Sequence, residues 1–179
     1  MILSINVVNG ILDDRDLRQF KDRRIILYDT SFLINRGADF IKNLNDVSVI
    51  NVVPDFIFSQ FKKVTDKEFE ANKRNVSKIL RERSSPNLII LMTPFRNDNF
   101  NAEDYIVDKR FRIIISKAST RANVKNEDGS FKRKVDNKDV MLLTLYYLLL
   151  LSGYDADILT EDKKMHEAKE EIRIKLFGS

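Results

Sequence analysis

Apolar and polar residues along this chain form blocks of two kinds. Four short apolar runs, rich in aliphatic and β-branched residues, occur at Arg24–Asp29, Val47–Val53, Asn87–Met92 and Asp157–Thr160. Runs of this length between polar residues are typical of buried strands. The segments between them, such as Thr30–Leu44, space their apolar residues as helices do. Strands that alternate with helices predict βαβ units, and therefore an α/β fold with a central, mainly parallel sheet.

Proline and glycine help to set the limits of the expected helices. Pro54 opens a helix after the second apolar run, because proline suits a first helical turn. A long polar helix is expected over Asp66–Arg83. An apolar helix over Asn137–Leu151 stops at Ser152-Gly153, a common C-terminal cap. The last helix is expected over Asp162–Leu176.

Two regions have a less regular pattern. Residues 1–23 predict a short strand followed by a polar helix around Asp13–Lys21. Residues 93–135 contain Phe111–Ile115, which the pattern leaves open between strand and helix, and a turn at Asp128-Gly129. We expect one domain over the whole chain, in which the first region is an N-terminal extension and the second an insertion.

Composition narrows the chemistry that the chain supports. The 179 residues include no cysteine and one histidine, His166, which excludes disulfides, thiol nucleophiles and multi-histidine metal centres. Lys and Arg number 31 against 27 Asp and Glu, and the net charge of +4 permits a nucleic-acid partner. The longest apolar run, Val140–Leu151, is shorter than the ~20 residues of a membrane span. With no basic segment before the first apolar stretch, we expect an intracellular, cytoplasmic protein with no membrane partner.

Three acids fall where this topology concentrates function. In a parallel sheet the functional crevice lies beyond the carboxyl ends of the strands, where strand order reverses. Asp29 and Asp162 follow strands, and Asp139 opens the apolar helix near the same edge. Three carboxylates there predict a hard-oxygen site for Mg²⁺ or Mn²⁺.

A structural interpretation of the same acids stands beside this one. Asp29 could N-cap the helix that follows it. Asp139 could complete a capping arrangement begun by Asp136. Asp162 could complement the dipole of the last helix.

The order and flanks of these acids resemble those of the PIN-domain nuclease family. The motifs are Asp29-Thr30-Ser31 after a strand, Val52-Val53-Pro54 before an apolar helix, Asp139 heading an apolar helix, and Asp157-x-x-Thr160-x-Asp162 before the last helix. The resemblance spans about Arg24 to Leu176. It implies a three-layer α/β/α sandwich whose acid cluster binds one or two Mg²⁺ or Mn²⁺ ions and hydrolyses single-stranded or structured RNA.

The resemblance also implies roles for individual residues. The carboxylates expected to hold the metal and support catalysis are Asp29, Asp139 and Asp162, with Asp136 as an auxiliary ligand. The polar side chains expected around them are Thr30, Ser31, Gln60 and Thr160. The family usually has Glu six residues after the proline, where this chain has Gln60. Its carbonyl oxygen can bind a metal, but it adds no negative charge.

A basic stretch precedes Asp139. From Lys109 to Lys138 there are ten basic and three acidic residues, with Phe111 and Phe131 among them. Lys and Arg contacts to phosphate supply most non-specific affinity for nucleic acid, and aromatic side chains allow base stacking. The candidate RNA-binding residues are Arg110, Arg112, Lys117, Arg121, Lys125, Lys132, Arg133 and Lys134. The alternative is a solvated loop whose charge only aids solubility.

A metal-dependent endoribonuclease is therefore the leading interpretation, and others stay open. Gln60 favours a degenerate PIN-like module that binds RNA or a protein partner without cleavage. The toxin half of a toxin–antitoxin pair and an unrelated α/β binding domain are further alternatives. A homodimer or a protein partner is compatible with each of them.

Overall fold

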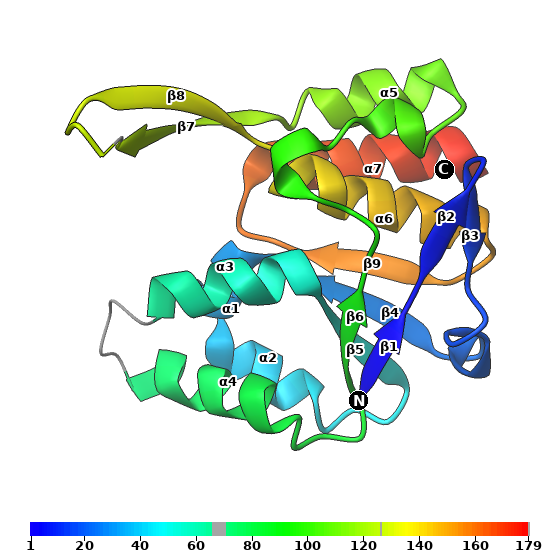
Figure 1. Cartoon of the computed structure of the whole chain (residues 1–179). Coiled ribbons are helices and arrows are strands. Elements are labelled where there is room, and N and C mark those ends of the chain that lie inside the picture. Colours follow the sequence, from blue (N-terminus) through cyan, green and yellow to red (C-terminus); the bar gives the residue numbers. More distant parts are fainter. Residues whose placement is uncertain (66–70, 126, 179) are drawn as a thin grey trace.

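A five-stranded parallel sheet forms the centre of the computed structural model, which describes residues 1–65, 71–125 and 127–178 (Figure 1). Neighbouring strands pair in parallel throughout this sheet. In spatial order the strands are β1 (Ile2–Ser4), β6 (Leu88–Met92), β5 (Val49–Pro54), β4 (Arg24–Tyr28) and β9 (Ala156–Leu159). The four apolar runs of the sequence coincide with β4, β5, β6 and β9, so these strand predictions are confirmed.

The middle strands of the sheet are buried on both faces. Every residue of β5 is buried, and Ile25 and Leu27 of β4 are fully buried. The register aligns Leu27 with Val52 of β5 on one side and with Ile158 of β9 on the other. Burial of both faces explains why these strands are continuous apolar runs rather than alternating ones.

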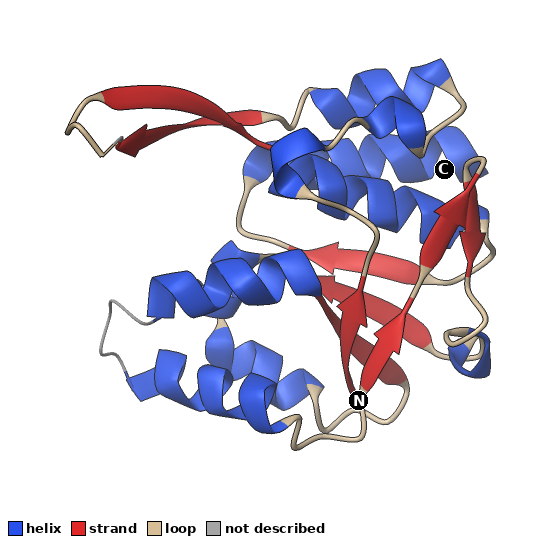
Figure 2. Ribbon diagram, viewed as in Figure 1, coloured by secondary structure: helices blue, strands red, loops and turns tan. Residues whose placement is uncertain are grey.

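Helices cover the sheet in two groups, one on each face (Figure 2). The first group contains α1 (Thr30–Asn35), α2 (Gly37–Asn43), α3 (Asp55–Thr65) and α4 (Ala71–Glu82). The second contains α5 (Lys109–Ser116), α6 (Lys138–Leu151) and α7 (Lys163–Phe177). The α/β class is confirmed, and the arrangement is compatible with the expected three-layer sandwich.

Helix α6 is the buried centre of the second group. All of its residues from Val140 to Leu150 are buried. It ends at Ser152-Gly153 as predicted, with Gly153 at φ +84° and its N–H donating to the Leu150 carbonyl oxygen at 3.0 Å. Among the described residues, no helix combines the length and apolarity needed to cross a membrane.

The N-terminal region differs from its prediction. Its first strand is β1, and a hairpin of β2 (Asn6–Val8) and β3 (Ile11–Asp13) follows. The hairpin turns at Asn9-Gly10, whose φ angles of +51° and +74° fit the two-residue turns that Asn-Gly favours. Because β1 pairs with β6, this region supplies an edge strand of the main sheet as well as an extension.

The polar helix predicted around Asp13–Lys21 is wrong. This segment contains only a 3₁₀ turn, η1 (Arg18–Phe20). Asp14 is buried and accepts a hydrogen bond from the Tyr154 hydroxyl at 2.7 Å. This long-range contact fixes a tight turn in a segment whose polar residues alone favoured a solvated helix.

Other corrections concern where helices begin. Residues 30–44 form two helices rather than one, since Arg36 leaves helical geometry at φ −125° and ψ +34°. Pro54 is the last residue of β5, and α3 begins one residue later. Part of the helix predicted over Asp66–Arg83 is observed as α4, and residues 66–70 lie outside the described part.

The region 93–135 contains a hairpin that the sequence did not predict. Its two strands, β7 (Thr120–Lys125) and β8 (Phe131–Asp136), are antiparallel and flank the predicted turn at Asp128-Gly129. Phe111–Ile115, left open by the sequence, is helical within α5. In Figure 1 the hairpin projects away from the helices, on the side toward which β9 points.

Candidate functional site: a carboxylate cluster at the sheet edge

The strand order places a switch point at β4. The chain passes from β4 to β5 on one side of it and returns much later to β9 on the other. Open α/β sheets bind ligands beyond the carboxyl end of such a strand. Asp29 is the residue directly after β4, so the sheet delivers a carboxylate to this position.

Hydroxyl groups from the first turn of α1 and from the loop after β9 hold the Asp29 side chain. Asp29 is buried, and its Oδ2 accepts hydrogen bonds from Ser31 Oγ and from Thr160 Oγ1, the latter at 2.8 Å. It occupies the N-cap position of α1 but its side chain makes no capping hydrogen bond. The capping interpretation of Asp29 is therefore wrong, and its carboxylate belongs to the sheet edge.

The loop after β9 brings Asp162 to the same place. Thr160, which donates to Asp29, also accepts a hydrogen bond from the Asp162 backbone N–H at 3.0 Å. Asp162 caps α7, since its Oδ1 accepts from the Met165 N–H at 2.9 Å. A structural role for Asp162 is thus observed, and it fixes the side chain close to Asp29.

Asp139 lies in the first turn of α6, and its pKa depends on the neighbouring acids as well as on its own burial. Burial, followed by repulsion from neighbouring carboxylates, raises its pKa to about 7. Those carboxylates, in order of their effect, are Asp29, Asp162 and Asp136, while Lys138 acts in the opposite direction. The acids that the sequence separates by more than a hundred residues therefore share one electrostatic environment.

Asp136 differs from the other three acids because it has a cationic partner. Lys138 Nζ lies 3.0 Å from both of its carboxylate oxygens, and the Lys138 N–H donates to Oδ1 at 3.1 Å. The N-cap residue of α6 is Asn137, whose side chain makes no capping bond. The structure therefore does not show the capping arrangement in which Asp136 begins the helix and Asp139 completes the cap.

Gln60 lies beside this cluster, as the resemblance implied. It is on α3, and its Oε1 accepts a hydrogen bond from the Thr30 hydroxyl at 2.7 Å. Thr30 directly follows Asp29, so the amide of Gln60 is held next to the acids. Of the predicted surrounding groups, the structure therefore brings Thr30, Ser31, Gln60 and Thr160 to one edge.

The donor set fits a hard cation held largely through water. Carboxylate, hydroxyl and amide oxygens are what Mg²⁺ and Mn²⁺ prefer. Within the described residues, no three His, Cys, Asp or Glu side chains are close enough to hold one ion directly. Mg²⁺ usually keeps several waters and takes only one or two carboxylates. The candidate ligands are thus compatible with such an ion, whereas a dedicated protein cage is not formed.

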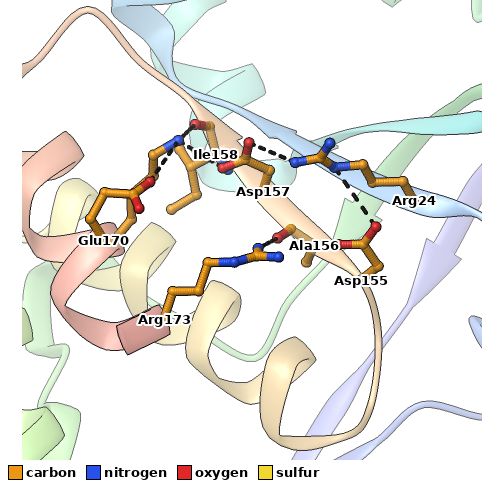
Figure 3. A network of polar contacts seen from close by, with 8 residues as sticks. Arg24, Asp155, Ala156, Asp157, Ile158, Glu170 and Arg173 are labelled. Atoms are coloured by element: carbon orange, nitrogen blue, oxygen red, sulfur yellow. Dashed lines mark hydrogen bonds and ion pairs between the residues drawn. The ribbon is translucent and has the colours of Figure 1, made fainter. Parts of the chain in front are cut away.

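A second group of acids provides an internal contrast (Figure 3). Asp157 of β9 lies 3.1 Å from Arg24 Nη2 and 2.7 Å from Nζ of Lys169, a buried lysine. Lys169 also donates to the Ile158 carbonyl oxygen at 2.8 Å. Of the residues that the structure describes, none forms an ion pair with Asp29, Asp139 or Asp162. Among the acids that the structure describes, this edge group combines a buried carboxylate, Asp29, with half-buried ones, Asp139 and Asp162, that lack a direct ion pair.

A groove of about 320 Å³ adjoins the cluster on the α3 side. Gln60 and Lys138 both line it, so it is next to the acids. Two further cations on its wall, Lys63 and Arg96, were missed by sequence reasoning because they lie outside the basic stretch, in segments with no excess of positive charge like that of Lys109–Lys138. The groove therefore combines positive side chains with the negative edge.

The candidate RNA-binding residues divide into two sets. Three on or beside α5 have acidic neighbours: Arg110 lies 2.7 Å from Asp108, Arg112 lies 3.3 Å from Glu103, and Lys117 lies 4.0 Å from Glu171. The other five lie on the β7–β8 hairpin: Arg121, Lys125, Lys132, Arg133 and Lys134. Their backbone is described and their side chains are outside the described part. The register puts Lys132 and Lys134 at positions of one face of the hairpin and the three others on the opposite face.

The fold and the site define an α/β domain with an acid cluster at a switch point of its sheet. Comparisons with protein-family models, curated proteins and solved structures gave no match. The resemblance to the PIN-domain family is therefore a prediction from the sequence that these comparisons leave untested.

Proposed function

We propose that this protein is a Mg²⁺- or Mn²⁺-dependent nuclease that hydrolyses RNA, an endoribonuclease of the PIN-like type. The observation that carries the proposal is that Asp29, Asp139 and Asp162 lie at one sheet edge and form no ion pair with a cation among the described residues. Each residue comes from a different part of the chain, and the edge is where open α/β sheets bind their ligands. The groove beside it carries three cations, Lys63, Arg96 and Lys138, against two acids, Asp55 and Asp98, and this excess of positive charge suits a polyanionic substrate.

The repulsion within the cluster favours a cation. Like charges in a partly buried site raise each other's pKa, and an ion of opposite charge relieves this effect. Asp139, with its pKa near 7, is partly protonated at neutral pH when no cation is near. Binding of a divalent ion would replace that proton.

Asp29, Asp139 and Asp162 would hold the ion, with Asp136 and the Gln60 carbonyl oxygen close by. When bound, such an ion lowers the pKa of a coordinated water and neutralises charge on a phosphodiester. The protein keeps the acids in position: Ser31 and Thr160 orient Asp29, and the capping bond to Met165 orients Asp162. Lys63 and Arg96 on the groove wall would bind phosphates of the strand.

A non-cleaving RNA-binding module is the second candidate. It is favoured by Gln60, whose neutral amide occupies the place where the resembling family has a carboxylate. The Thr30 hydroxyl holds this amide at 2.7 Å. A site with one charge fewer binds divalent ions more weakly.

The test is cleavage of a labelled single-stranded RNA of mixed sequence, with Mg²⁺, Mn²⁺ or excess chelator. We expect cleavage only with metal, and a loss of at least about 100-fold in Asp29→Asn and in Asp162→Asn. Asparagine caps helices as well as aspartate does, so Asp162→Asn removes charge while keeping the α7 cap. Asp155→Asn is the matched control, because Asp155 is exposed just before β9.

Two results would contradict the nuclease. Cleavage at the parental rate in either edge variant, at saturating metal, would remove these acids from the reaction. Tight RNA binding without any metal-dependent cleavage would favour the non-cleaving module.

A further inference from the structure

A second cavity, of about 340 Å³, lies on the hairpin side of α6. It is bounded by α5, the start of α6, the residue before β7, and the turn η3 (Ala102–Asp104). Its apolar walls come from Phe100, Ala102, Ile113 and Val140. The volume is at the lower end of the range of small-ligand sites, which are mostly apolar with a few polar groups.

One wall of this cavity carries a charged donor that is not fully used. Arg112 lines it, and the Arg112 Nε–H is buried with no hydrogen-bond partner among the described residues. The guanidinium reaches Glu103 only through Nη1, at 3.3 Å. Lys109 adds a second positive charge to the lining. Buried polar groups normally have partners, so an unpaired charged donor points to a missing acceptor.

The cavity and the groove at the acid cluster are neighbours. Asn137 lines the cavity and Lys138 lines the groove. Between them, Asn97 accepts from the Asn137 N–H at 2.9 Å, and the Asn137 side-chain amide donates to the Asn97 carbonyl oxygen at 3.0 Å. The paired asparagines therefore separate the cavity from the groove. Asp139 of the acid cluster directly follows Lys138 in the sequence.

We propose that this cavity binds one nucleotide of a single-stranded RNA whose neighbouring phosphodiester lies in the groove beside the acid cluster. The base packs against the apolar wall, and the phosphate contacts the guanidinium of Arg112 and the ammonium of Lys109. This assignment rests on the proposed function for the position of the scissile bond. The nucleotide site itself stands on the cavity and the unpaired donor.

The experiment measures binding without cleavage. ¹⁵N-labelled protein in chelator is titrated with adenosine, guanosine, cytidine and uridine 5′-monophosphates, and with an RNA tetranucleotide, which the proposed metal-dependent reaction leaves intact in chelator. We expect the tetranucleotide to shift the amide resonances of Ile113, Ser116 and Asn137, and free monophosphates to shift the same residues more weakly.

Three variants make the titration specific. Arg112→Lys keeps the charge that faces Glu103 but removes the Nε donor, and should weaken binding about tenfold. Ala102→Leu fills the apolar wall and should also weaken it. Arg15→Lys is the control, because Arg15 is an exposed arginine that pairs with Asp13 and does not line the cavity; its binding should equal that of the parent.

The outcomes separate this proposal from the nuclease. Shifts in the cavity that Arg112→Lys reduces and Arg15→Lys does not would support it, even if no metal-dependent cleavage is found. Binding of free monophosphates with no binding of the tetranucleotide would overturn the placement of a strand. Cleavage of RNA with no shift at the cavity, or equal binding in all variants, would overturn the nucleotide site while leaving the nuclease intact.

Discussion

Strands β4 and β9 carry two groups of acids that differ in what surrounds them. Asp157, within β9, is matched by Arg24 and by the buried Lys169. Asp29 and Asp162, beyond the carboxyl ends of the same strands, have hydroxyl and backbone N–H partners but no cation among the described residues. The same sheet thus holds one neutralised group and one that keeps its charge.

The difference indicates what each group does. A buried acid paired with a lysine completes the polar contacts of the fold, and removing one partner leaves an unpaired charge. A cluster of acids that repel each other opposes folding instead. Proteins break local rules of this kind mainly at functional sites. The unmatched group is therefore the one to which we assign ligand binding.

The contrast between the two groups of acids predicts its largest effect on the free energy of unfolding. The pKa of Asp139 is raised from 3.8 to about 7 in the folded protein. The folded state therefore binds more protons than the unfolded state between pH 4 and pH 7, and the free energy of unfolding falls as the pH rises through this window. Without metal, Asp139→Asn should remove this loss and raise the free energy of unfolding by roughly 2–3 kcal/mol at pH 8.

Asp157→Asn should have the opposite sign. It leaves the ammonium of Lys169 buried without its carboxylate, and should lower the free energy of unfolding by about 1–3 kcal/mol. Urea unfolding of both variants in chelator, at pH 5 and pH 8, measures the two effects. The gain from Asp139→Asn should shrink at pH 5. A loss of stability in both variants would show that the edge acids are structural like Asp157.

The sequence predicted β4 and β9 because each is a continuous apolar run. It predicted Asp29 and Asp162 as site residues because each follows one of these runs, where a parallel sheet binds its ligands. The hydrogen bond from Thr160 to Asp29 joins residues 131 positions apart. No local pattern encodes such a contact, but the strand order brings it about.

Other features depended on long-range contacts that the sequence does not display. The Asn9-Gly10 dipeptide is a local hairpin signal, although the prediction for residues 1–23 contained no hairpin. The pairing of Asp14 with Tyr154, in contrast, has no signal in its own segment, and the predicted helix there was wrong. The cavity at Arg112 likewise forms from four separate segments, so only the fold reveals it.

The positive charge of the β7–β8 hairpin predicts where RNA binds, in contrast to the negative charge of the edge acids. The edge acids cannot attract RNA, and the β7–β8 hairpin projects on the same side of the sheet (Figure 1). Replacing Lys132, Arg133 and Lys134 by Ala should reduce the slope of log affinity against log salt by roughly 0.7 per lost phosphate contact. Binding at moderate salt should fall about tenfold, measured by fluorescence anisotropy with a single-stranded RNA in chelator.

The control for this variant removes the same charge elsewhere. The control replaces three lysines outside the hairpin by Ala: Lys42 of α2, and Lys164 and Lys175 of α7. This variant should change the slope of log affinity against log salt much less. Equal slopes in the two triple variants would mean that only net charge matters. An unchanged slope in the hairpin variant would place the RNA on another surface.

The smallest expected effect comes from adding one charge to the edge. In the parent protein the Thr30 hydroxyl donates to Gln60 Oε1 at 2.7 Å. Gln60→Glu keeps an oxygen that can accept this hydrogen bond and places a further carboxylate near Asp29. In a partly buried site this strengthens attraction for a divalent ion beyond its value in bulk water. We expect Mn²⁺ to bind about three- to tenfold more tightly, and RNA cleavage at limiting Mn²⁺ to rise by a similar factor.

Without metal, the same substitution should weaken RNA binding and lower stability slightly, because it adds repulsion among the acids. The chain has one other glutamine, Gln19, which is exposed and donates to the Asp16 carbonyl oxygen. Gln19→Glu adds the same charge before the amino end of β4, opposite the end that carries Asp29, and is the matched control. Mn²⁺ affinity should be measured by calorimetry, and cleavage across a Mn²⁺ titration, for the parent and both variants. Tighter Mn²⁺ binding in Gln60→Glu alone would show that the unmatched acids act as a cation site. Equal Mn²⁺ affinity in all three proteins would mean that the amide of Gln60, like Asp157, serves the fold.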